Sequence, residues 1–302
     1  MSSKIQQLIK HYELPAHYGN WVDEYFTPLA KNIALRQKKK ANTAYVLGIQ
    51  GTQGSGKSTV AEFIKCLLSE QYHLNCVVVS IDDFYLTLDQ RIELSHTIHP
   101  LLKTRGVPGS HDIPLAMSII EKLMSQQAGE STQIPRFDKA SDDRHPVKFW
   151  SEYRGKIDVI IFEGWCVGVP AQPPKALKQS VNLLEANEDA QLVWRSYVNA
   201  QLANSYQGLF TLLDDLLVLQ APSFEVVYQW RLLQEQKLIM GLTVQGQNNS
   251  NNHTLDSEQL KRFISHYQRL TEHALRCIPE RASWVLYQNA QHEFTRLVSA
   301  YN

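Results

Sequence analysis

The stretch Tyr45-Val46-Leu47-Gly48-Ile49-Gln50-Gly51-Thr52-Gln53-Gly54-Ser55-Gly56-Lys57-Ser58-Thr59 decides how this chain is organised. It contains G-x-x-x-x-G-K-S from Gly51 to Ser58, a pattern typical of a phosphate-binding P-loop. Glycines let the backbone turn tightly and approach phosphate oxygens, and successive N–H groups then face inward as an anion site. We expect residues Gly51–Thr59 to bind ATP, with Lys57 on the β- and γ-phosphates and the Ser58 hydroxyl on Mg²⁺.

The segments on either side of the motif predict the secondary structure that a P-loop needs. Ala44–Ile49 is a short apolar run with β-branched and aromatic members, which predicts a buried strand. Apolar residues then recur at helical spacing, at Val60, Phe63, Ile64, Leu67 and Leu68. The alternative is a glycine-rich turn that binds nothing, and the order of strand, loop and helix disfavours it.

The composition limits the class of protein. A chain of 302 residues can bury an ample core, and its 30 basic and 30 acidic residues balance, so we expect neither nucleic acid nor membrane as a partner. Four scattered cysteines without a C-x-x-C pair are typical of reduced thiols. Met1–Lys10 lacks an apolar signal core, and no run approaches the roughly 18 apolar residues of a membrane span. These features predict a cytoplasmic protein.

Two further apolar runs end in acidic residues. Cys76–Ile81 predicts a parallel strand followed by Asp82 and Asp83, and Ile157–Phe162 predicts another, followed by Glu163 and a glycine. Functional groups gather at the carboxyl ends of strands in open α/β sheets, so Asp82 is a candidate catalytic residue. Glu163 is a candidate for the Mg²⁺ site, because an acid after a buried strand is the usual partner of a P-loop. The alternative for Asp82 is a cap on the turn after its strand.

The remaining segments complete one predicted domain over residues 1–302. Residues 1–40 form a helical extension, and residues 86–156 form a long connection without an obvious strand, expected to be a substrate-binding insertion. Residues 173–255 are expected to form a helical and lid region with helices over Ala176–Leu184, Ala190–Leu209 and Phe224–Met240.

Arg231 lies on the last of these helices, which would close over a nucleotide; an ordinary surface helix is the alternative. Gln245–Asn252 is rich in asparagine and glutamine, which predicts a flexible lid tip. Leu216–Leu219 and Ser283–Tyr287 predict a fourth and a fifth strand. The expected fold class is therefore α/β, a three-layer P-loop NTPase sandwich with a five-stranded, mainly parallel sheet and helical additions.

With these residues identified, the chain resembles the small-molecule P-loop kinases, a group that includes phosphoribulokinase, uridine kinase and bacterial pantothenate kinase. Three segments are most similar to plant-type D-glycerate 3-kinase: Arg105-Gly106-x-Pro108-Gly109-x-His111-Asp112, Pro135-x-Phe137-Asp138-Lys139 and Trp230-Arg231-x-x-Gln234-Glu235. The resemblance covers nearly the whole chain.

The resemblance implies a role for each matching residue. Asp82 matches the catalytic acid that accepts the proton of the substrate hydroxyl, and it acts with Lys57 and Glu163, the acid of the magnesium site. Arg231 lies on the segment similar to the lid. The residues placed on the substrate side are Asp83, Tyr85, Arg105, His111, Asp138, Lys139 and Arg144.

The leading hypothesis is Mg·ATP-dependent phosphorylation of a small hydroxy acid, first of all D-glycerate on its 3-hydroxyl. One alternative is a kinase for a nucleoside, pantothenate or a sugar phosphate. A P-loop switch or ATPase is disfavoured because N/T-K-x-D and L-S-G-G-Q are absent and Glu163-Gly164 replaces the motor-type acid pair. A catalytically silent nucleotide-binding regulator is disfavoured because Lys57, Asp82 and Glu163 are all present.

Overall fold

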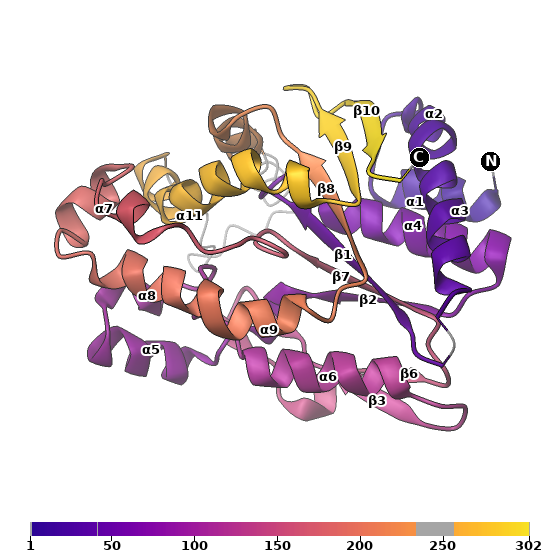
Figure 1. Ribbon diagram of the computed structural model, residues 1–302, viewed down its shortest axis with the longest axis horizontal. Coiled ribbons are helices and arrows are strands. Elements are labelled where there is room, and N and C mark those ends of the chain that lie inside the picture. The colour runs from indigo at the N-terminus through magenta and orange to yellow at the C-terminus, as the bar shows by residue number, and fades with distance from the viewer. Residues whose placement is uncertain (1, 41, 234–256, 302) are drawn as a thin grey trace, which may run out of the picture.

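A six-stranded sheet forms the centre of the computed structural model, which describes residues 2–40, 42–233 and 257–301. Its strands follow the order β10-β9-β8-β1-β7-β2 (Figure 1). Their bounds are β1 Tyr45–Gly51, β2 Cys76–Ser80, β7 Val159–Gly164, β8 Asp215–Gln220, β9 Trp284–Gln288 and β10 Phe294–Ser299. All neighbours pair in parallel except β9 and β10, which are antiparallel.

The central strands are buried on both faces, as continuous apolar runs in a parallel sheet require. Side chains alternate between the two faces. Val46, Ile160 and Val218 belong to one hydrophobic cluster, whereas Leu47, Ile161 and Leu217 belong to the other. Because both faces are covered by helices, the structure has three layers, and the predicted α/β class is confirmed.

One helical layer comes from the N-terminal part of the chain and the P-loop helix (Figure 1). It consists of α1 Ser3–His11, α2 Tyr18–Trp21, a π-helical turn Val22–Phe26, α3 Thr27–Gln37 and α4 Lys57–Tyr72. The apolar residues expected on the inner face of the P-loop helix, from Val60 to Leu68, are all buried.

The other face is covered by helices from three different parts of the chain (Figure 1). They are α6 Ile113–Ser125, the π-helical turn Leu202–Tyr206 with α9 Gln207–Phe210, and α11 Ser257–Cys277. Asp112 caps α6 by accepting a hydrogen bond from the Leu115 N–H, and Pro114 lies in the first turn of that helix.

The prediction of five strands was wrong, because β10 is a sixth. Only Phe294 of this strand is buried; the other five residues are partly or fully exposed, since β10 is an edge strand. A register shift between Phe294 and Arg296 further interrupts its pattern. Its pairing is set by the turn after β9 and by packing against the N-terminal helices, which short-range apolar patterning does not reveal.

The expectation that residues 86–156 lack strands was also wrong. This insertion contains two antiparallel ribbons, β3 Ser131–Ile134 with β6 Ser151–Arg154 and β4 Phe137–Asp138 with β5 Asp143–Arg144. Strands of two to four residues with polar side chains give little sequence signal. The insertion also contains α5 Leu88–Thr97, α6 and the 3₁₀ turns Pro100–Lys103 and Val147–Phe149, and the 3₁₀ turn Ile81–Phe84 precedes it.

Helix bounds after residue 173 differ from those expected. Ala176–Leu184 is not one helix: a 3₁₀ turn covers Pro174–Leu177 and α7 covers Leu183–Glu188. α8 begins at Val193 and ends at Gln201, and the chain continues through the π-helical turn into α9. Residues 224–233 are helical, whereas the predicted lid tip Gln245–Asn252 lies outside the described residues. Within the described ranges, no helix combines the length and apolar character of a membrane span.

Candidate active site

The P-loop turns from β1 into α4 through two glycines in the left-handed region. Gly54 has φ +79° and Gly56 has φ +82°, backbone angles that glycine adopts without the penalty of a side chain. α4 begins directly after Gly56, so its first N–H groups and its partial positive charge face the same space as the loop. The hydroxyls of Thr52 and Ser55 are buried and have no hydrogen-bond partner among the described residues.

A pocket of about 570 Å³ lies beyond the carboxyl ends of the parallel strands. Eight segments distant in sequence contribute to it among the described residues. Its lining includes Gln53, Gly54, Gly56, Lys57, Ser58 and Thr59 of the P-loop and α4, Asp82 and Tyr85 after β2, Arg105 and Lys139 of the insertion, Glu163 and Trp165 after β7, Trp230 and Arg231, Phe263 and Tyr267 of α11, and His292.

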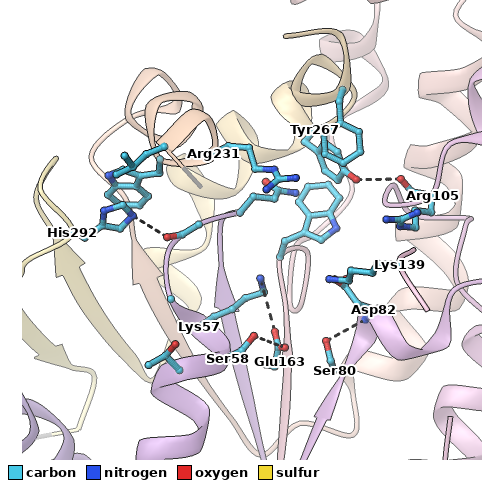
Figure 2. Close-up of a pocket in the computed structure, with 18 of the residues that line it drawn as sticks. Lys57, Ser58, Ser80, Asp82, Arg105, Lys139, Glu163, Arg231, Tyr267 and His292 are labelled. Atoms are coloured by element: carbon cyan, nitrogen blue, oxygen red, sulfur yellow. Dashed lines mark hydrogen bonds and ion pairs between the residues drawn. The ribbon is translucent and has the colours of Figure 1, made fainter. Parts of the chain in front are cut away.

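Ser58 and Glu163 meet at the floor of this pocket (Figure 2). The Ser58 hydroxyl donates a hydrogen bond to Glu163 Oε1 at 2.9 Å, and Lys57 Nζ lies 4.0 Å from Glu163 Oε2. Glu163 is only 4% exposed, and its Oε2 accepts no hydrogen bond within the described part of the chain. A buried carboxylate oxygen without a donor is a position where a cation would satisfy the unused charge.

Asp82 lies across the pocket from Lys57 and Ser58 (Figure 2). The Ser80 hydroxyl accepts the Asp82 N–H at 3.3 Å and so shapes the turn that presents the carboxylate. The Tyr85 hydroxyl donates to Asp82 Oδ1 at 2.9 Å, and Lys139 Nζ donates to Asp82 Oδ2 at 3.1 Å. Burial by itself would raise the pKa of Asp82, but the charges of Lys139 and Lys57 outweigh it and lower the pKa to about 2.

Arg105 is held at the rim of the pocket by three contacts. Its guanidinium pairs with Asp142 and lies 5.4 Å from the centre of the Phe137 ring. Its backbone oxygen accepts a hydrogen bond from the Tyr267 hydroxyl at 3.1 Å. Arg105 therefore comes to the pocket as a cation whose backbone and head group are both fixed by neighbouring elements.

Tyr85 is fixed from behind by His111. The two rings stack with centroids 4.4 Å apart, and His111 Nδ1 is 2.6 Å from the Tyr206 hydroxyl. His111 is buried, which lowers the pKa of its imidazole to about 4, so the ring is neutral at neutral pH. His111 thus supports the pocket wall from behind.

Several residues predicted for the substrate side lie outside the pocket lining. Asp83 accepts hydrogen bonds from Arg136 and from the Phe137 N–H, and Asp138 accepts one from the Ser141 hydroxyl. Arg144 donates to the Tyr85 backbone oxygen and to Asp112. Asp83, Arg144 and His111 connect the insertion to the turn after β2, whereas Asp138 shapes a turn within the insertion. The structure brings Lys57, Ser58, Tyr85, Asp82, Arg105, Lys139, Glu163 and Arg231 to the pocket itself.

Apart from Tyr85, the aromatic residues of the lining were not predicted as site residues. Trp230 stacks on His292, with ring centroids 4.0 Å apart, and His292 Nε2 lies 2.9 Å from the Gly54 backbone oxygen. The Trp165 ring packs edge-on against Tyr267 at 4.9 Å. Trp165 follows Glu163 by two residues, and Trp230 directly precedes Arg231. Their positions in the sequence beside predicted site residues could have indicated that they line the pocket. Phe263 and Tyr267 on α11 carry no such signal.

Comparison with known proteins agrees with this arrangement. The chain is 32% identical over 242 residues to an uncharacterized kinase of Schizosaccharomyces pombe, a match covering 77% of this chain and 81% of that protein. It is 30% identical over 233 residues to the chloroplastic D-glycerate 3-kinase of Arabidopsis thaliana, covering 74% of this chain and 46% of the plant protein.

A solved structure of D-glycerate 3-kinase from Cryptococcus neoformans superposes with a TM-score of 0.71 at 25% identity and covers 90% of this chain and 97% of that one. No protein-family model matches.

Fold, pocket and relatives together place the protein in the class of ATP-dependent small-molecule kinases with a P-loop. Within that class, the chain belongs to the family that contains the fission yeast kinase and the plant-type D-glycerate 3-kinases. The resemblance predicted from the sequence is thereby confirmed. The compartment stays a prediction, since the plant relative is named as chloroplastic.

Proposed function

We propose that this kinase transfers the γ-phosphoryl group of ATP to the hydroxyl of a small acid, with D-glycerate as the acceptor and 3-phosphoglycerate as the product. One observation carries the proposal: Arg105 and Lys139 line the same pocket as Lys57 and Asp82. Two cations beside a carboxylate that can serve as base suit an acceptor that has both an anionic group and a hydroxyl. Two relatives bear the name D-glycerate 3-kinase.

Asp82 is the proposed base. Its carboxylate stays ionised near neutral pH, because its pKa is lowered to about 2. In the transfer step, the acceptor oxygen forms a bond to the γ-phosphorus while the bond from that phosphorus to the β,γ-bridging oxygen breaks. The hydroxyl proton passes to Asp82, and ADP leaves. Tyr85 holds one carboxylate oxygen in place through its 2.9 Å hydrogen bond, so that the other can face the acceptor.

The phosphate side of the pocket is assigned to the P-loop. Backbone N–H groups of Gly51–Thr59 and the start of α4 would bind the phosphates, and Lys57 would neutralise charge on the transferred group. The hydroxyls of Thr52 and Ser55, which have no hydrogen-bond partner in the described part of the chain, lie in this loop and are available for polar contacts.

We assign the metal site to Ser58 and Glu163. Both offer oxygen ligands, which Mg²⁺ prefers, and Glu163 Oε2, which accepts no hydrogen bond among the described residues, fits a cation or a water molecule of its hydration shell. When bound, Mg²⁺ would offset the negative charge that develops on the phosphate groups. The buried position of Glu163 keeps its carboxylate directed at this point rather than at bulk water.

Arg231 is the proposed lid cation. It lines the pocket from the helical segment 224–233, and its guanidinium lies 5.8 Å from the centre of the Phe263 ring. Figure 2 shows it above Lys57, on the side of the pocket away from Ser58 and Glu163. We propose residues 173–255 as a helical and lid region, residues 86–156 as the substrate-binding insertion and residues 1–40 as an N-terminal helical extension of a single kinase domain. Closure would exclude water from the transferring phosphate.

The test is a substrate panel. The protein is incubated with Mg·ATP and D-glycerate, L-glycerate, pantothenate, uridine or ribulose 5-phosphate, and products are identified by mass. Phosphoglycerate from the D-isomer is the expected product. Phosphorylation of another compound instead would identify the alternative, a kinase for a nucleoside, pantothenate or a sugar phosphate. ATP hydrolysis without any phosphorylated product would contradict the proposal and favour a regulatory ATP-binding protein.

Asp82→Asn tests the base separately. This change keeps the shape of the side chain but removes the proton acceptor, so turnover should fall by about 10²–10⁴ while ATP still binds. Asp23→Asn, at an exposed aspartate of the N-terminal extension, is the matched control and should leave turnover unaltered. A near-normal rate for Asp82→Asn would remove Asp82 as the base.

A further inference from the structure

We propose that Lys139 blocks Asp82 in the absence of acceptor, and that an anionic acceptor releases the base by drawing the lysine to itself. This inference rests on the proposed function, because it gives the acceptor's negative charge a second role. The acceptor would be recognised by Lys139 and would at the same time make Asp82 available. Proton abstraction would then depend on a bound acid and would not begin with ATP alone.

Both oxygens of the Asp82 carboxylate already accept a hydrogen bond. Tyr85 donates to Oδ1 at 2.9 Å and Lys139 donates to Oδ2 at 3.1 Å. The two donors differ in freedom. Tyr85 is 4% exposed and stacked on His111, whereas the Lys139 side chain is 65% exposed. Lys139 is therefore the donor that can leave, and Oδ2 is the oxygen that its departure frees.

The backbone that carries Lys139 is held firmly. Lys139 lies in the turn between β4 and β5, and Asp142 of the same turn accepts hydrogen bonds from Arg91 and Arg105. Arg91 is fully buried and also donates to the backbone oxygen of Lys103 at 2.8 Å. Because the turn is fixed by these contacts, only the flexible lysine side chain needs to move, and its ammonium can exchange partners without a change in the fold.

The competing partner would come from the same pocket. Lys139 and Arg105 both line it, so an acid bound to Arg105 places its charge near the lysine. Figure 2 shows Arg105, Lys139 and Asp82 on one wall, across from Lys57 and Ser58. When the ammonium turns to the acid, Oδ2 becomes free to accept the hydrogen bond of the acceptor hydroxyl. Burial raises the pKa of Asp82, and the charge of Lys139 is the largest of the influences that lower it. Departure of the lysine therefore also strengthens the base.

The contact has a consequence for wasteful hydrolysis. In that reaction a water oxygen bonds to the γ-phosphorus, the bond from that phosphorus to the β,γ-bridging oxygen breaks, and the proton of water needs a base. With Oδ2 held by Lys139, Asp82 is a poor acceptor for that proton. ATP hydrolysis without acceptor should therefore be slow in the wild-type protein, and the lysine should be the reason.

Lys139→Met tests this directly, since it keeps the length of the side chain and removes the cation. Phosphate release from Mg·ATP is measured in the full chain without acceptor. The rate should rise about fivefold, the shift that loss of a partly exposed ion pair permits. The rise should be absent from the double variant that also carries Asp82→Asn. It should also be absent from Lys139→Arg, which keeps a cation at this position. Lys122→Met, at an exposed lysine of the same insertion, is the control and should show no rise.

A second measurement needs no variant. Propionate has a carboxylate but no hydroxyl, so it would draw Lys139 away without accepting phosphate, and it should raise ATP hydrolysis by the wild-type protein. Hydrolysis by Lys139→Met that stays at or below the wild-type rate, together with no response to propionate, would overturn the inference. Failure of the proposed function is distinct: the wild-type protein would then form no phosphorylated acid from the panel, whereas failure of this inference alone leaves that product in place.

Discussion

Gly106 offers a sharp test of how the fold supports the pocket. Its φ of +128° lies where side chains are strained, and a Cβ at this position would overlap the Tyr267 hydroxyl and lie 2.7 Å from Tyr267 Cε1. Its backbone oxygen also holds a residue of the pocket lining, because it accepts a hydrogen bond from Trp165 Nε1 at 3.0 Å. Gly106→Ala should therefore strain the backbone and displace the Tyr267 ring, which hydrogen-bonds to the backbone oxygen of Arg105.

The size of the effect follows from three contributions. The strained backbone costs about 1–3 kcal/mol, the lost Tyr267 hydrogen bond about 1 kcal/mol, and displacement in a packed site about 1 kcal/mol or more. The free energy of unfolding of Gly106→Ala should thus fall by about 4 kcal/mol. Gly129→Ala is the matched control, because Gly129 has φ +91° but its Cβ would meet no atom within 4 Å. Its free energy of unfolding should fall by only about 1–2 kcal/mol, the cost of the backbone strain alone.

Urea unfolding of both variants measures these values, and initial rates give KM for the acceptor and for ATP. Because Gly106 lies beside Arg105 and away from the P-loop, KM for the acceptor should rise more than KM for ATP. A Gly106→Ala variant that loses no more stability than Gly129→Ala would refute the proposed clash. Equal changes in the two KM values would refute the link between this glycine and the acceptor side.

Two further predictions concern stability. Buried Asp215 accepts hydrogen bonds from Arg36, Tyr45, Ser283 and Tyr301, so Asp215→Ala should lower the free energy of unfolding in urea by about 3 kcal/mol, and an effect under about 1 kcal/mol would contradict this. The pKa of His111 is lowered from 6.5 to about 4, so the unfolded chain binds the proton more tightly. Stability should fall by up to about 3 kcal/mol as the pH drops from 6.5 to 4, and a His111→Gln variant that falls just as steeply would contradict this.

The sequence by itself determined the centre of this fold. The order of apolar run, glycine loop and amphipathic segment at Tyr45–Leu68 needs no partner to be recognised, because each feature is local. The same holds for the apolar strands before Asp82 and Glu163. Since parallel strands place their carboxyl ends at one edge, Lys57, Asp82 and Glu163 could be predicted to meet at a common site, and they line one pocket.

The tertiary structure decided what surrounds that centre. Whether an acidic or basic side chain faces the pocket depends on partners far away in sequence. Arg136 donates a hydrogen bond to Asp83, and Arg144 donates one to the backbone oxygen of Tyr85, so neither Asp83 nor Arg144 lines the pocket. Tyr267 reaches the pocket from α11, more than 100 residues after Arg105, whose backbone oxygen it contacts. Edge strand β10 and the short ribbons of the insertion likewise depend on pairing rather than on local pattern. Local patterns carry the proposed phosphate-binding half of the site, whereas the proposed acceptor half is formed by long-range contacts that no short stretch of sequence records.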